Sequence, residues 1–148
     1  MKPNAVLAGA FLTLAAGSAH GCDITYDPKP SWEEMIDASD VVFVGRVIAE
    51  LPKDEIEWRD LVLFKVEVPI KGELGAQLEV AQGMNSCTRS FNVGSHVIFA
   101  GTTSILNDGY RFIWAGDTGW DPTVSLSDPP TAEQQAQLNY LKTITEVR

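Results

Sequence analysis

The chain has 148 residues, and its 20 Asp and Glu against 11 Lys and Arg give it a formal net charge of −9. This length suits one domain with a single core. An acidic surface repels phosphate backbones and anionic lipid headgroups, and the sequence has no Lys/Arg cluster to counter that repulsion. Nucleic acid is therefore not expected as a partner.

Residues 1–21 have the pattern of a secretory signal peptide. Met1 and Lys2 supply a positive start, an apolar run extends from Ala5 to Ala16, and small residues follow. The run is too short to cross a bilayer, and no second apolar span follows it, so a transmembrane segment is not expected. We predict a signal peptide at 1–21 and one mature domain at 22–148, secreted or periplasmic.

The junction between these two parts leaves its processing open. Small residues permit cleavage after Ala19 or after Gly21, and only the second cut makes Cys22 the first residue. A lipoprotein signal, which would anchor Cys22 through a lipid, is a third alternative, although the junction lacks the usual Leu three residues before the cysteine.

Cys22 and Cys87 are the only cysteines in the chain. In an exported protein, an even cysteine count predicts a disulfide. Such a bond would tie the mature N-terminus to a loop far along the chain. Closing a loop of this length stabilises a fold by roughly 4 kcal/mol in the chain-entropy model.

Helices are predicted near both ends of the mature chain. Ser31 and Glu34 form a capping-box pattern that begins a short helix ending at about Ala38. Thr131 can cap a second helix that extends to about Ile144. Residues three and four apart share a face of a helix. The expected buried sides contain Trp32, Met35 and Ile36 in the first helix, and Leu138, Leu141 and Ile144 in the second.

Five strands are predicted between the helices from β-branched residues, alternation and turn residues. They cover 41–49, 61–68, 77–81, 96–100 and 110–114. Gly45 marks a candidate bulge or sharp bend in the first strand. Alternation in the second strand places Phe64, Val66 and Val68 inward. The connection 51–60 is expected to be an exposed hairpin loop, 107–109 a hairpin turn, and 115–130 irregular.

Short antiparallel strands in one small domain favour a barrel, because closure removes exposed strand edges. The predicted fold class is mainly β. Its architecture is a five-stranded barrel of the oligonucleotide/oligosaccharide-binding (OB) type with a short N-terminal helix and a C-terminal helix.

Five features follow one another along the chain: the cysteine at 22, the strand Ser39–Val47, the turn Lys71-Gly72, the loop Met84–Cys87, and Phe99–Gly101 before a hairpin. In their order and spacing they resemble the netrin-like module and, within it, the tissue inhibitors of metalloproteinases. The resemblance covers Cys22 to about Trp120.

The resemblance implies an OB-like barrel in which Cys22 is bonded to Cys87. In the family, the amino group and carbonyl of the first cysteine chelate the catalytic zinc of a metalloprotease. By position, Cys22 would hold the partner's zinc through its main chain and Asp23 would enter the adjacent pocket. The implied inhibitory ridge consists of Cys22, Asp23, Ile24, Thr25, Met84, Asn85, Ser86, Cys87 and Thr88.

The chemistry of the chain terminus agrees with this role. Catalytic zinc keeps an open coordination position, and a neutral amine with its adjacent carbonyl forms a five-membered chelate there. An α-amino group has a reference pKa of about 7.7–8.0, so its neutralisation costs little near neutral pH. An acylated or extended N-terminus could not bind zinc in this way.

The sequence also differs from the family pattern, which begins Cys-x-Cys and favours a small hydroxyl residue in second place. Here Asp23 is second and Ile24 third, and the cysteine-rich second domain of animal inhibitors is missing. These differences support the alternative of a non-inhibitory, periplasmic or extracellular interaction module of the same fold.

An enzyme is not expected, because the rest of the sequence contains no recognisable catalytic motif. The sequence has no nucleophile elbow, zinc-binding helix motif or phosphate loop. His96 has no Cys, Asp or Glu at ligand or triad spacing, and is expected to be a structural or surface residue. No cofactor is predicted, and a zinc metalloprotease is the expected partner.

Overall fold

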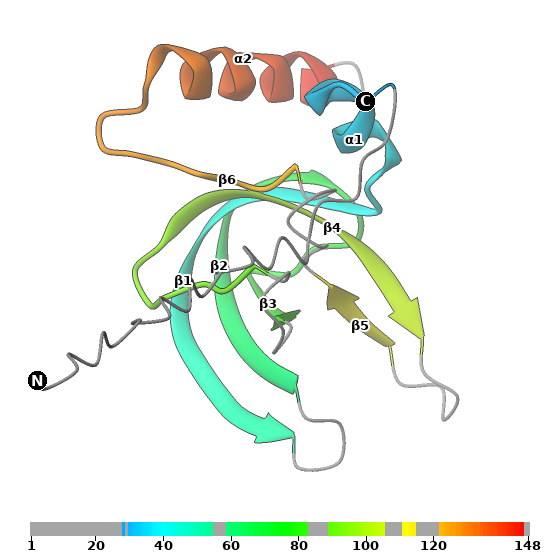
Figure 1. Ribbon diagram of the computed structural model, residues 1–148, viewed down its shortest axis with the longest axis vertical. Coiled ribbons are helices and arrows are strands. Elements are labelled where there is room, and N and C mark those ends of the chain that lie inside the picture. The colour runs from blue at the N-terminus through cyan, green and yellow to red at the C-terminus, as the bar shows by residue number, and fades with distance from the viewer. Residues whose placement is uncertain are drawn as a thin grey trace, which may run out of the picture.

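The computed structural model describes Pro28 and residues 30–54, 59–82, 89–105, 111–114 and 122–146. The prediction of a mainly β fold with two helices is confirmed (Figure 1). The helices are α1 (Trp32–Ala38) and α2 (Ala132–Glu146). The strands are β1 (Val41–Asp54), β2 (Arg59–Lys71), β3 (Gln77–Gln82), β4 (His96–Ile105), β5 (Arg111–Trp114) and β6 (Val124–Ser125).

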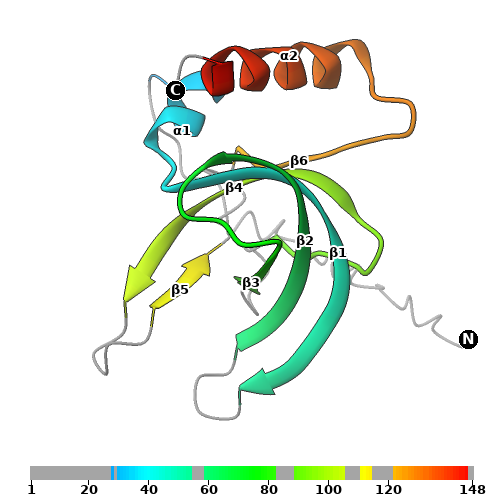
Figure 2. The same ribbon diagram turned by 180° about the vertical axis from the view of Figure 1, so that it is seen from behind.

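These strands form one sheet in the order β1-β2-β3-β5-β4-β6, and β1 also pairs with β4. The pairing of β3 with β5 is parallel, and the other pairings are antiparallel. On β1, Val44 lies opposite Val68 of β2 and Ile98 of β4. Both helices lie on the same side of the curved strands, as the two opposite views show (Figures 1 and 2).

Both helices begin at the capping residues that the sequence predicted. In α1, the Ser31 hydroxyl accepts a hydrogen bond from the Glu34 amide at 3.2 Å, and the Glu34 carboxylate accepts one from the Ser31 amide at 2.7 Å. Thr131 caps α2 in the same way, with its hydroxyl 3.2 Å from the Gln134 amide. Both predicted caps are confirmed.

Strand lengths differ from the prediction. Within the segment expected as the loop 51–60, residues 51–54 continue β1 and residues 59–60 begin β2, with Leu51 opposite Leu61 and Asp54 opposite Arg59. Pairing between the two strands therefore extends them over charged residues, which have a low intrinsic preference for strands. The segment expected to be irregular at 115–130 contains β6. The hairpin turn predicted at 107–109 lies outside the described residues, although β4 and β5 pair as antiparallel neighbours on either side of it.

A change of register occurs at Gly45, where a bulge was predicted. Val44 pairs with Val68 but Gly45 pairs with Val66, so β2 has one extra residue there. Such an insertion interrupts the alternation of side chains. Val66 packs against the core as expected, whereas Val68 is 48% exposed. The predicted inward position of Val68 is therefore wrong.

Two apolar clusters lie on opposite faces of the sheet. The inner cluster is centred on four phenylalanines, and Phe43 stacks on Phe99 with 4.9 Å between ring centroids. Phe64 contacts both and meets Phe91 edge to face at 5.3 Å. The outer cluster joins the sheet to the helices through Ile36, Val42, Val44, Ile70, Ile98, Ala100 and Leu141. The helices thus cover one face of the sheet, and the phenylalanines fill the other.

Candidate functional site

The ridge implied by the family resemblance lies outside the described residues. This applies to Cys22–Thr25, to Met84–Thr88 and to the predicted bond between Cys22 and Cys87. The residues that border the second of these segments are described. They define where the chain leaves β3 and where it returns.

Two buried residues, Gln82 and Phe91, lie on either side of the segment 83–88 in the sequence. Gln82, the last residue of β3, is 8% exposed, and its side-chain oxygen accepts a hydrogen bond from the Phe91 amide at 2.7 Å. The Phe91 ring is 3% exposed and packs on Phe64. A hydrogen bond between two buried groups and an aromatic contact therefore fix the two ends of the loop relative to each other.

A pocket of about 340 Å³ lies beside Gln82 and Phe91. Its walls come from the C-terminal part of β1, from the N-terminal part of β2 and from residues on either side of the segment 83–88. They are Glu50, Leu51, Asp60, Leu61, Gln82, Ser90, Phe91 and Asn92. A partner that contacts the loop would therefore also meet a surface with carboxylate, amide and apolar groups.

The chain that leads from the N-terminus enters the fold at α1, which is firmly attached. The indole Nε1 of Trp32 donates to the Pro122 carbonyl at 2.7 Å, and its ring meets Tyr140 of α2 at 5.8 Å and 71°. Burial, the nearby Asp37 and Glu33 carboxylates and a hydrogen bond with Asp37 raise the pKa of the Tyr140 hydroxyl. Helix α1 is therefore held against α2.

A second polar cluster joins three strands on the outer face. Glu67 of β2 lies 3.7 Å from Arg46 of β1 and 3.1 Å from Nε2 of His96 at the start of β4. The His96–Glu67 distance permits an ion pair when the ring is protonated, but the atoms are not aligned as a hydrogen bond. Arg46 also donates to the Gly94 carbonyl at 3.2 Å. The cluster links the strands at the rim of the sheet, and His96 has the structural position expected for it.

The sequence did not predict the contacts of Glu67 or the hydrogen bond between Gln82 and Phe91. Glu67 lies on β2, and its two neighbours, Arg46 and His96, come from strands that are distant in the sequence. Gln82 follows an alternating strand, and no signal in the sequence indicated that its side chain would bridge to Phe91. Such contacts depend on how the strands pair.

Within the described ranges, no three His, Cys, Asp or Glu side chains converge in a way that could hold a metal ion. Of the two described helices, neither is long and apolar enough to cross a membrane.

Comparison with protein-family models, with curated proteins and with solved structures found no match to this chain.

Proposed function

We propose that this protein is an exported binding module with an OB-type barrel that inhibits a zinc metalloprotease through its N-terminal cysteine. The pairing order of the strands is the observation that carries the proposal. Strands β1, β2 and β3 are consecutive neighbours, and β4 lies on the other side of β1. This spatial order, 4-1-2-3, is that of a Greek key.

The pairing of β5 also supports a barrel. This strand pairs with β3 on one side and with β4 on the other, so each strand from β1 to β5 has two neighbours. A five-stranded Greek-key barrel is the architecture of an OB-type domain. The strand order therefore supports the fold that the netrin-like resemblance implies.

The proposed inhibitory ridge joins Cys22–Thr25 to Met84–Thr88 through the predicted disulfide. The buried Gln82–Phe91 hydrogen bond supports this role, because it fixes the base of the loop that contains Cys87. A rigid ridge loses little conformational entropy when it binds. The Cys22 amine and carbonyl would occupy the open position of the protease zinc.

A non-inhibitory interaction module is the second candidate function, and Asp23 is the observation that favours it. Burying its carboxylate beside a zinc ion in an apolar pocket costs several kcal/mol unless the charge is paired. In this case the same surface, with its adjoining pocket, would bind another exported protein. Attachment of a lipid to Cys22 would fit this second function but would block zinc chelation.

Extension of the N-terminus tests the proposal directly. One Ala placed before Cys22 removes the free amine from the first cysteine and leaves the barrel unchanged. A protein with one Ala added after Arg148 has the same mass and is the matched control. Titrated against a panel of zinc metalloproteases, the native and control proteins should inhibit and the N-terminally extended protein should not. Equal inhibition by all three proteins, or by none, would reject the chelation mechanism.

A further inference from the structure

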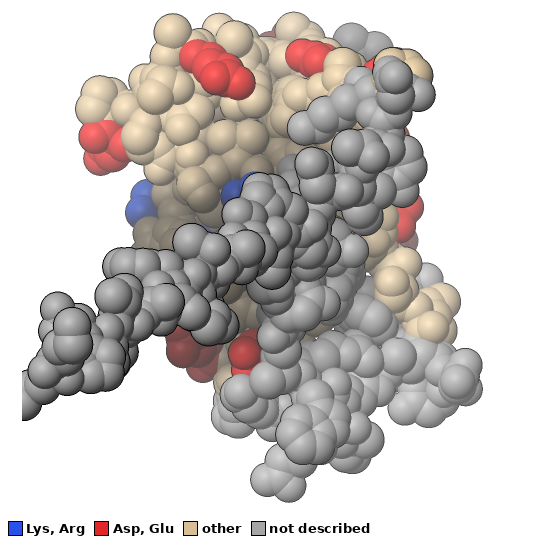
Figure 3. Space-filling view, in the orientation of Figure 1, with Lys and Arg blue, Asp and Glu red and all other residues tan. Residues whose placement is uncertain are grey.

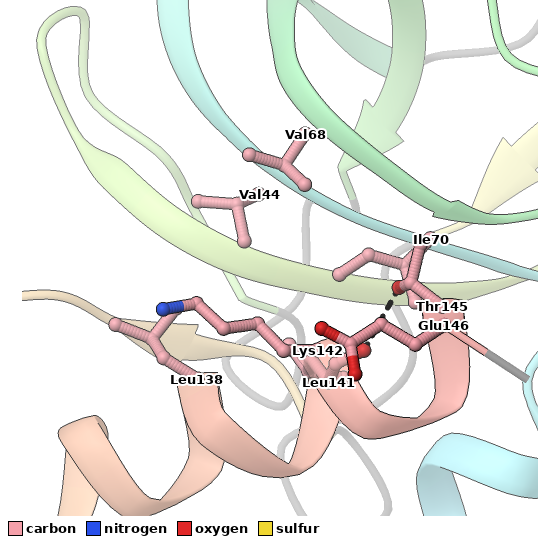
Figure 4. A pocket seen from close by; sticks show the side chains of 8 residues that line it. All are labelled: Val44, Val68, Ile70, Leu138, Leu141, Lys142, Thr145 and Glu146. Atoms are coloured by element: carbon pink, nitrogen blue, oxygen red, sulfur yellow. Dashed lines mark hydrogen bonds between the residues drawn. The ribbon is translucent and has the colours of Figure 1, made fainter.

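An apolar groove lies between α2 and the outer face of β1 and β2, far in the sequence from the proposed ridge. Its volume is about 220 Å³. Val44, Val68 and Ile70 line it from the sheet, and Leu138 and Leu141 line it from α2 (Figure 4). Inhibition through Cys22 does not involve this groove.

The groove lies beside a place where the helix packs closely on the sheet. Leu141 is 2% exposed and Ile70 8% exposed, so α2 is packed tightly against β2 there. Further along, Leu138 is only partly buried and Val68 is 48% exposed. The register shift at Gly45 turns Val68 to this face, where the described residues do not cover it.

A single cation lies over this space. The stem of Lys142 runs along the groove, and its amino group reaches the end marked by Leu138 (Figure 4). No carboxylate of the described residues forms an ion pair with Lys142. Glu146 lies toward the other end of the groove (Figure 4).

We propose that this groove binds an amphipathic anion of the fatty-acid class, free in solution. Its alkyl chain lies among Val44, Val68 and Leu138, and its carboxylate pairs with Lys142. Apolar cavities of about 150 Å³ already hold a benzene-sized ligand, so a groove of 220 Å³ can hold most of a medium-length chain. Its half-open side lets the remaining carbons extend into solvent.

The overall acidity of the protein does not oppose this assignment. The formal net charge of −9 acts at long range, and solvent ions screen it beyond a Debye length of about 10 Å at 0.1 M salt. Acidic side chains are spread over the helical layer in Figure 3. Two charged residues line the groove, Lys142 and Glu146. The amino group of Lys142 lies at the end near Leu138, so a carboxylate placed there meets the cation (Figure 4).

Decanoate, used below its micellar concentration, is the probe for this site. Titration calorimetry on the mature protein should give saturable binding at one site. Val68→Trp, at a half-exposed position that tolerates a larger side chain, should fill the groove and abolish binding. Lys142→Glu should weaken binding at least tenfold. Ile105→Ser changes an apolar residue that is 64% exposed elsewhere and should leave the affinity unchanged.

Two further ligands separate the alternatives. Decyltrimethylammonium has the same chain with a positive head and should bind at least tenfold more weakly than decanoate; equal affinity would refute the role of Lys142. Vesicles of mixed neutral and anionic phospholipid should not sediment the protein. Binding to vesicles without binding to decanoate would identify the groove as a membrane contact and overturn the proposal. Absence of decanoate binding, or unchanged binding in Val68→Trp, would also overturn it.

Discussion

The side-chain oxygen of Gln82 accepts a hydrogen bond from the backbone amide of Phe91 at 2.7 Å, and both residues are buried. The two residues lie on either side of the loop that contains Cys87. Their bond connects the end of β3 to the aromatic core, since the Phe91 ring packs on Phe64 and Phe99. The hydrogen bond is thus part of the packing around the aromatic core.

Gln82→Leu should lower the free energy of unfolding by about 1–3 kcal/mol, because the buried Phe91 amide then has no acceptor. Gln77→Leu is the matched control, since Gln77 is on the same strand but exposed. Urea unfolding of both variants measures the difference. A loss in Gln82→Leu no larger than in the control would mean that the bond contributes nothing to stability.

Gly45→Ala should destabilise the protein by about 1–3 kcal/mol. A Cβ atom at this position would lie 2.5 Å from the Lys65 carbonyl and 2.9 Å from ring carbons of Phe43. Gly75→Ala is the control, because its nearest neighbour would be at 3.4 Å. Thermal unfolding should show a large decrease in Tm for the first variant and little change for the second. Similar values for the two would contradict the close approach at the bulge.

Tyr140 should make stability fall at alkaline pH. Burial, with Asp37 and Glu33 nearby, raises the pKa of Tyr140 in the folded protein, so the folded state retains the phenolic proton more strongly than the unfolded state. This contribution is fully present below about pH 10, where unfolded tyrosine titrates, and is lost as the pH rises through the higher folded value. Tyr140→Phe should remove it.

The measurement is the free energy of unfolding of native and Tyr140→Phe proteins between pH 8 and 11.5, on the order of the tyrosine range. All other titratable groups are common to the two proteins, so the difference between the two curves isolates Tyr140. That difference should be constant up to about pH 10 and then change in the direction that favours the variant. A constant difference throughout would show that Tyr140 titrates alike in both states.

Features that depend on neighbours in the sequence were predictable. Ser31 with Glu34, and Thr131, identified the starts of both helices, because a cap needs only residues within one turn. Gly45 indicated an irregularity in its strand for a similar reason, because glycine inside a strand often marks a bulge or a bend. The register does change there, but the extra residue lies in β2 and not in β1.

Features that depend on pairing between distant strands were not predictable. The outward position of Val68 follows from a register shift, and alternation alone cannot reveal an inserted residue. The Gln82–Phe91 bond requires the chain to return across a loop, and the groove beneath Lys142 requires α2 to contact β2. The sequence contains these residues but not the distances between them.

The bond between Cys22 and Cys87 stays a prediction based on export and on the cysteine count. Peptide mapping of the exported protein without reducing agent should yield one linked species that contains both residues. Reduction should release the two peptides and lower the stability by roughly 4 kcal/mol in the chain-entropy model. Two free thiols, or a diacylglyceryl mass on Cys22, would remove the link and favour the lipid-anchored alternative.

Asp23→Thr should strengthen inhibition of a zinc metalloprotease, in contrast to the loss expected from N-terminal extension. Asp23 follows the chelating cysteine and would enter the pocket beside the zinc, where an unpaired carboxylate resists desolvation by several kcal/mol. Threonine is small, keeps a hydroxyl and removes the charge. Asp27→Thr is the matched control, because it removes the same charge from the same leading segment, away from the proposed ridge. Dose–response curves for native, Asp23→Thr and Asp27→Thr proteins against several metalloproteases should show a lower inhibition constant for Asp23→Thr alone. If neither the native nor the Asp23→Thr protein inhibits any of them, the chelation mechanism is rejected and the interaction-module alternative takes its place.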